Sequence, residues 1–81
     1  MQICKEDIYG MIARILEVNI EIIKNMNEDD DFAIHGMTSI SAIQLVVELE
    51  GEYDFEFPDE DLLIDKFNTP NKLFALLEGY E

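Results

Sequence analysis

The chain has 81 residues, with 19 Asp and Glu against 5 Lys and Arg, which gives a formal charge of −14. This length allows one small hydrophobic core and leaves little room for an enclosed active site. The charge argues against nucleic acids and anionic membranes as direct partners, because both require Lys and Arg to neutralise phosphates. We expect instead a partner with a basic surface patch.

The composition is that of a folded protein. Hydrophobic residues make up 48% of the chain, which is enough to build a core and excludes a disordered acidic tail. Cys4 is the only cysteine, so an internal disulfide or a cysteine-based zinc site is excluded. The sequence shows neither a signal peptide nor an apolar run of the ~18–20 residues that cross a membrane. We therefore expect a single cytoplasmic domain over residues 1–81.

The first quarter of the chain predicts a helix. Apolar residues at helical spacing predict that it runs from Lys5 to Val18. The next segment, residues 19–38, is polar and contains the acidic run Glu28-Asp29-Asp30-Asp31, so we predict a long loop. A loop of this length needs anchors in so small a domain. The expected anchors are Ile20, Ile22, Ile23, Phe32 and Ile34.

The second helix is predicted from Ser39 to Tyr53, with Thr38 or Ser39 as its N-cap. On a helical wheel it has two apolar stripes, whereas a surface helix needs one. The first stripe comprises Ala42, Leu45, Val46 and Leu49, and the second comprises Ile40, Ile43 and Val47. The second stripe would be core if the helix were central. Because a short chain can hardly surround a helix, we favour an exposed apolar patch edged by acids, as found at interaction sites.

Two proline-containing turns predict the remaining helices. Pro58-Asp59-Glu60 predicts a short third helix that runs through Leu62 and Leu63, with Asp59 as its cap. Thr69-Pro70 predicts the start of a last helix that directs three leucines and Phe74 inward. Because no run is long enough to predict a strand, the expected fold class is all-α. It is a small four-helix bundle with three longer helices, one short helix and a long first loop.

Ser39 stands at the start of the second helix. By position alone, a serine there is most simply an N-cap. A phosphate attached at the same position would lie beside free backbone N–H groups and the positive end of the helix dipole. His35, Gly36 and Met37 precede it and are expected in an exposed loop.

The segment Gly36-Met37-Thr38-Ser39-Ile40, followed by an acidic amphipathic helix and by Pro58-Asp59-Glu60, resembles the acyl and peptidyl carrier proteins of fatty-acid, polyketide and nonribosomal-peptide assembly. The resemblance covers essentially the whole chain, and a start at Met1 without a linker fits a free-standing carrier. It implies that a phosphopantetheinyl transferase joins 4′-phosphopantetheine from coenzyme A to Ser39. The thiol of that arm then holds an acyl, aminoacyl or peptidyl group as a thioester, and the chain itself is not an enzyme.

The resemblance also implies a docking surface on the second helix. Its positions here are Ile40, Ile43, Gln44, Val47, Glu48 and Glu50. The apolar members would dock against loading enzymes and downstream synthases or transferases, while the acids would face basic patches on these partners of a monomeric carrier. Many family members have Asp where this chain has Thr38, and an acid where it has Gln44. Both departures favour a dedicated secondary-metabolite pathway.

The alternative interpretation is an acidic helical adaptor without a prosthetic group. It would bind a basic partner through Ile40, Ile43 and Val47, and Ser39 would only be a cap. An enzyme is the least supported class, because the sequence has no nucleophile–base pair and no phosphate-binding glycine loop. The acidic segments lack the central glycine of a calcium-binding EF-hand, so no metal site is predicted.

Overall fold

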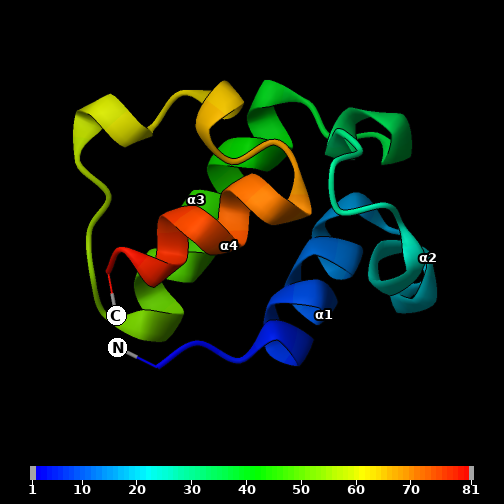
Figure 1. Cartoon of the computed structure of the whole chain (residues 1–81), viewed down its shortest axis with the longest axis horizontal. Helices are drawn as coiled ribbons and strands as arrows, with labels where there is room; N and C mark the ends of the chain where they lie inside the picture. The colour runs from blue at the N-terminus through cyan, green and yellow to red at the C-terminus, as the bar shows by residue number, and fades with distance from the viewer. Residues whose placement is uncertain (1, 81) are drawn as a thin grey trace.

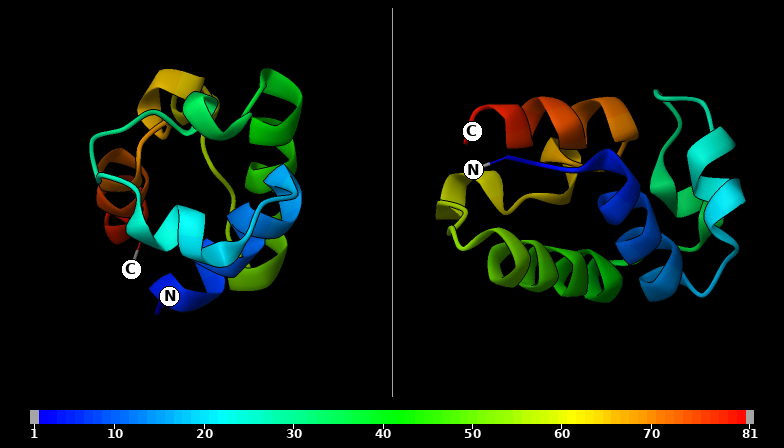
Figure 2. Two further views of the ribbon diagram at one scale, coloured as in Figure 1. Left: turned by 90° about the vertical axis from the view of Figure 1, so that its right-hand side faces the viewer. Right: turned by 90° about the horizontal axis from the view of Figure 1, so that it is seen from below.

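The computed structural model describes residues 2–80 of the chain. Its helices in chain order are α1 (Lys5–Leu16), α2 (Ile20–Asn25), η1 (Phe32–His35), α3 (Ser39–Tyr53), η2 (Asp59–Asp61), η3 (Ile64–Lys66) and α4 (Pro70–Glu78), where η marks a 3₁₀ helix. Figure 1 shows α4 in front of α3 with α1 beside them, and the second panel of Figure 2 separates α3 and α4 across the bundle. The part of the chain described contains no strand, and the predicted all-α four-helix fold is confirmed.

The core is built from one stripe of each long helix. Helical spacing brings these residues onto a single side of each helix, where they meet at the centre of the bundle. The buried residues are Ile8, Met11 and Ile12 of α1, Ala42, Leu45, Val46 and Leu49 of α3, and Leu73, Phe74 and Leu77 of α4. They confirm the core stripe predicted for α3 and most of those predicted for α1 and α4, where Ile15, Leu16 and Leu76 are only partly buried. None of the helices described is both long and apolar enough to cross a lipid bilayer.

The prediction of one continuous loop over residues 19–38 is wrong. This segment contains α2, which Asn19 caps by accepting a hydrogen bond from the Glu21 N–H at 2.9 Å, and it also contains η1. Of the expected anchors, Ile23 and Phe32 are fully buried, whereas Ile22 and Ile34 are exposed. Helices of four to six residues contain too few apolar repeats for periodicity to reveal them.

The predicted third helix is also wrong in type. The segment from Pro58 to Leu63 forms only the 3₁₀ turn η2, and a second turn, η3, follows it. Asp59 does not cap it; the cap position is Pro58, which makes no side-chain cap bond. The three apolar residues at positions 62–64 are consecutive, so they cannot all face one side of a helix, and all three are exposed.

The loop before α3 is fixed to the start of α4 by acid–amide hydrogen bonds. The carboxylate of Asp31 accepts from the Asn68 amide at 2.7 Å, and that of Asp29 accepts from the Asn71 amide at 2.8 Å. The Phe32 N–H donates to the backbone carbonyl of Asn68 at 2.8 Å. Part of the acidic run is therefore structural, and it positions the chain that enters α3.

An aromatic cluster closes the opposite end of the bundle. Phe55, Phe57 and Tyr80 contact one another, with ring centroids 4.8–5.6 Å apart. The hydroxyl of Tyr80 donates a hydrogen bond to the carboxylate of Asp61. Burial, together with this acidic partner, raises the pKa of Tyr80 to about 12.

The cluster predicts a loss of stability at high pH. The folded protein keeps Tyr80 protonated at pH values where the unfolded chain, with a tyrosine pKa of about 10, releases the proton. The stabilisation is therefore complete below pH 10 and is lost as the pH rises from about 10 towards 12. Thermal unfolding across this range should show a steeper fall of the midpoint in the wild type than in Tyr80→Phe. Equal falls in the two proteins would contradict this role of Tyr80.

Candidate functional site

The start of α3 is closed by a reciprocal capping box. Thr38 has an extended backbone, and its Oγ1 accepts a hydrogen bond from the Ser41 N–H at 3.3 Å. In return, Ser41 Oγ accepts one from the Thr38 N–H at 2.8 Å. These bonds satisfy backbone groups that a helix start leaves without partners. Of the two caps considered from the sequence, Thr38 is therefore the cap, and Ser39 is not.

Ser39 is the first residue of α3, and its side chain is exposed. Within residues 2–80, none of the side-chain hydrogen bonds involves its hydroxyl, whereas the hydroxyls of Thr38 and Ser41 are both engaged. Gly36, in the left-handed conformation at φ 99°, ends η1 and turns the chain towards α3. Met37, which we expected in an exposed loop, is instead buried in the core. The hydroxyl of Ser39 is thus free of hydrogen bonds, while the capping box holds the backbone on both sides of it.

The surroundings of Ser39 suit an attached phosphate. The first turn of α3 contains no acidic residue, and residues 39–47 carry no charged side chain. Backbone N–H groups and the positive end of the helix dipole face outward at a helix start, and they stabilise an anion. A phosphodiester on Ser39 would therefore meet no nearby acid of its own helix.

An apolar hollow opens beside Ser39, between α3 and the segment of residues 62–67, which includes η3. It has a volume of about 460 Å³, within the usual range for small-molecule sites. Its lining comprises Ser39, Ala42, Ile43, Val46, Leu62, Leu63, Ile64 and Phe67. Leu62 and Leu63, which we predicted in a helix, therefore form one wall of this hollow together with Ile64. An apolar group bonded at Ser39 would therefore have an apolar surface beside it.

The second apolar stripe of α3 is exposed, as predicted. The exposed fractions are 72% for Ile40, 64% for Ile43 and 60% for Val47. The fourth uncharged residue of the expected docking set, Gln44, is exposed as well. The stripe lies on the opposite side of α3 from the buried residues, so it can contact a partner without unfolding the bundle.

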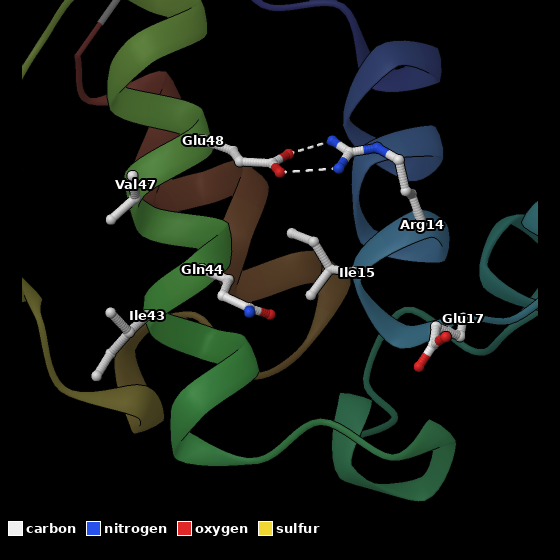
Figure 3. A pocket seen from close by; sticks show the side chains of 7 residues that line it. All are labelled: Arg14, Ile15, Glu17, Ile43, Gln44, Val47 and Glu48. Atoms are coloured by element: carbon white, nitrogen blue, oxygen red, sulfur yellow. Dashed lines mark hydrogen bonds and ion pairs between the residues drawn. The ribbon is translucent and has the colours of Figure 1, made fainter.

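The two acids of the expected docking set are bonded within the chain. Both carboxylate oxygens of Glu48 pair with the guanidinium of Arg14 on α1, as Figure 3 shows. The hydrogen bond and charge of Glu48 raise the pKa of Arg14 above its ordinary value. Glu50 accepts a hydrogen bond from the Phe57 N–H at 2.9 Å. Sequence patterns could not reveal the role of Arg14, because it lies 34 positions from Glu48 and on another helix.

A shallow groove runs between α1 and α3, with a volume of about 500 Å³. Its lining residues are Arg14, Ile15 and Glu17 of the α1 segment, and Ile43, Gln44, Val47 and Glu48 of α3. We call it the α1–α3 groove. In Figure 3, Gln44 and Glu48 point towards α1, Ile15 lies between the helices, and Ile43 and Val47 form the outer edge.

The phosphopantetheine attachment site family matches residues 6–77 of the chain. Two similar sequences are named D-alanyl carrier protein. That of Leuconostoc citreum is 30% identical over 75 residues, which cover 93% of this chain and 92% of the relative. That of Leuconostoc mesenteroides is 32% identical over 74 residues, 90% of this chain and 95% of the relative. An acyl carrier protein of Chlorobium phaeobacteroides is 37% identical over 57 residues, 70% of each chain.

The capping box predicts unequal effects of two neighbouring substitutions on stability. Thr38→Ala removes the cap and should lower the free energy of unfolding by about 1 kcal/mol. Ser39→Ala removes a hydroxyl without a bonding partner and should change it by less than ~0.5 kcal/mol. Urea unfolding of the unmodified proteins measures both values. If Ser39→Ala costs as much as Thr38→Ala, Ser39 is a structural cap.

Proposed function

The chain belongs to the phosphopantetheine attachment family of carrier proteins, and we propose that Ser39 is the residue that bears its 4′-phosphopantetheine arm. Ser39 and Ser41 are the only serines of the chain. The hydroxyl of Ser41 is held in the capping box, so the exposed, unbonded hydroxyl of Ser39 is the one that a transferase can reach. This difference between two serines of one helical turn carries the proposal.

The chemistry at Ser39 is a phosphoryl transfer from coenzyme A. Ser39 Oγ forms a bond to the phosphorus that bears the pantetheine and loses its proton to a base of the transferase, and the nucleotide part of coenzyme A leaves. The arm supplies a terminal thiol that holds the cargo as a thioester. The chain contributes an accessible hydroxyl, a helix start that favours the added negative charge and a rigid base for the arm. Catalysis belongs to its partners, not to this chain.

The cargo is an acyl, aminoacyl or peptidyl group, and the comparisons favour the aminoacyl class. The two D-alanyl carrier proteins match at least 90% of the chain, whereas the acyl carrier protein matches 70%. Thr38 and Gln44 leave the attachment turn without the acids expected of a general carrier. They support a dedicated pathway, such as one for a secondary metabolite, over general fatty-acid synthesis.

The acidic side chains and the exposed apolar stripe of α3 contribute differently to partner docking. The segment from Lys24 to Lys66 contains 13 acids and no Lys or Arg between its ends, and it surrounds the uncharged start of α3. We propose that the electrostatic field of these acids attracts basic patches on the transferase, the loading enzyme and the downstream synthase, and so guides these enzymes to α3. The exposed stripe of Ile40, Ile43 and Val47 then makes the contact. Residues 1–81 would act as one monomeric, cytoplasmic carrier domain.

Modification by a transferase tests the attachment site. The purified chain, incubated with a broad-specificity phosphopantetheinyl transferase, coenzyme A and magnesium, should gain the mass of one phosphopantetheine. Ser39→Ala should abolish the gain, because it removes the attacking oxygen. Ser41→Ala, the matched control two residues away, should keep it. Intact-protein mass spectrometry reads all three results.

The same measurement distinguishes the carrier from the adaptor. A wild type that several transferases leave unmodified would favour an acidic adaptor, in which Ser39 is only part of a helix start. A mass gain that persists in Ser39→Ala and disappears in Ser41→Ala would show that Ser41, and not Ser39, is the attachment site. Either result overturns the assignment of Ser39.

The exposed stripe predicts a defect in docking without a defect in folding. Ile43→Asp places a charge in the stripe and should lower the kcat/KM of arm attachment at least tenfold, as expected for an interface anchor. Its circular dichroism spectrum and thermal unfolding should stay close to those of the wild type, since Ile43 is 64% exposed. Ile22→Asp on α2, where Ile22 is 43% exposed, is the control and should be modified normally. Equal rates for both variants would contradict docking through the stripe.

A further inference from the structure

The middle of the α1–α3 groove carries no unpaired charge, although the chain carries a charge of −14 and the carboxylate of Glu17 lies at one end of the lining. Within its lining, Ile15, Ile43 and Val47 are apolar and Gln44 is uncharged. Glu48 closes one end of the groove, and Arg14 neutralises it through both carboxylate oxygens (Figure 3). Glu17 lies at the other end and is displaced from the apolar residues.

The Arg14–Glu48 pair differs from the other ion pair found among residues 2–80. That pair joins Lys24 to Glu6 at 2.6 Å between α2 and α1, where neither residue lines the groove. Arg14 holds Glu48 in a two-bond arrangement, which is stronger and more directional than a single contact. A Lys or Arg of a partner would have to displace Arg14 before it could bind Glu48. The groove is therefore a poor receptor for a basic side chain.

The groove begins within one helical turn of the attachment position. Residues four apart lie on one side of a helix, so Ser39, Ile43 and Val47 follow one another along the same face of α3. An enzyme that catalyses attachment of the arm to Ser39 Oγ must cover this part of the surface. An enzyme that acts on the thiol needs to reach only the far end of the arm, so the chemistry itself does not require it to cover the groove. The transferase is thus the partner whose contact with the groove is required by geometry.

We propose that the α1–α3 groove receives an uncharged apolar side chain of the phosphopantetheinyl transferase, and that Arg14 enables this contact by keeping Glu48 neutralised. The inference rests on the proposed attachment at Ser39. If it holds, α1 takes part in partner recognition. Arg14 is then a positioning residue, because it acts on the partner through Glu48. The basic patches of the partner then meet the acidic segments around the groove and not the groove itself.

Desolvation is the physical reason for the pair. An apolar side chain that fills the groove removes water from Glu48, whose side chain is only 31% exposed in the free protein. Removing water from a carboxylate without a partner is costly, whereas a carboxylate already bonded to a guanidinium loses less. The side chain of Arg14 is 65% exposed, so it can keep part of its contact with solvent.

The test compares charge variants of the groove by the kcat/KM of arm attachment. The assay uses the full chain, a broad-specificity transferase and coenzyme A in 0.3 M NaCl, where a Debye length below about 8 Å suppresses long-range steering. Arg14→Gln leaves Glu48 unpaired and should lower kcat/KM about tenfold or more. The double variant Arg14→Gln/Glu48→Gln removes the unpaired charge and should recover most of the loss. A purely structural role of the pair would not produce this recovery.

The variant Gln44→Glu, at an exposed position, is an independent test of whether the groove tolerates a negative charge. It adds an unpaired carboxylate to the middle of the groove and should also lower kcat/KM several-fold. A basic partner residue in the groove predicts the opposite sign, with a higher kcat/KM for both Arg14→Gln and Gln44→Glu. A rise in either variant, or rates equal to the wild type in all of them, overturns the proposal. A wild type that gains no arm contradicts the attachment at Ser39 and, with it, this role of the groove.

Discussion

The burial of only one side of α3 organises this small protein. Leu45 and Leu49 are almost completely buried in the bundle, and α1 packs against the same helix. A chain of this length cannot cover the other side as well, so Ile40, Ile43 and Val47 stay in contact with water. Removing that apolar surface from water is favourable at about 25 cal/mol per Å², which supports the partner contact that we propose for it. The exposed stripe is thus a consequence of size as much as of composition.

The capping box and the Arg14–Glu48 pair have a common effect on this face. Thr38 and Ser41 satisfy the start of α3 with hydroxyl groups, where an acidic cap would place a negative charge beside Ser39. Arg14 neutralises the first acid of the helix. The strong negative charge of the chain therefore surrounds the proposed attachment site without entering it, and a phosphate at Ser39 would add charge where little repulsion exists.

The sequence predicts the long elements and misses those that depend on tertiary contacts. Ser39–Tyr53 forms a helix with the predicted bounds, because fifteen residues repeat the apolar pattern several times. α2 escapes prediction because six residues repeat it too few times, and its stability comes from the burial of Ile23. The exposed stripe could be predicted from the wheel, since it needs only the spacing of residues. The bonds of Glu48 to Arg14 and of Glu50 to Phe57 could not, because local spacing does not encode them.

The central claim is that the arm is bonded to Ser39, the one serine whose hydroxyl the helix start leaves free. A ³¹P–¹H correlation spectrum of the modified protein tests it most directly, because it connects the phosphorus of the arm to the protons of the residue that carries it. We expect a cross-peak between the phosphodiester and the β-protons of Ser39. A cross-peak to the β-protons of Ser41, or to no serine of the chain, would contradict it.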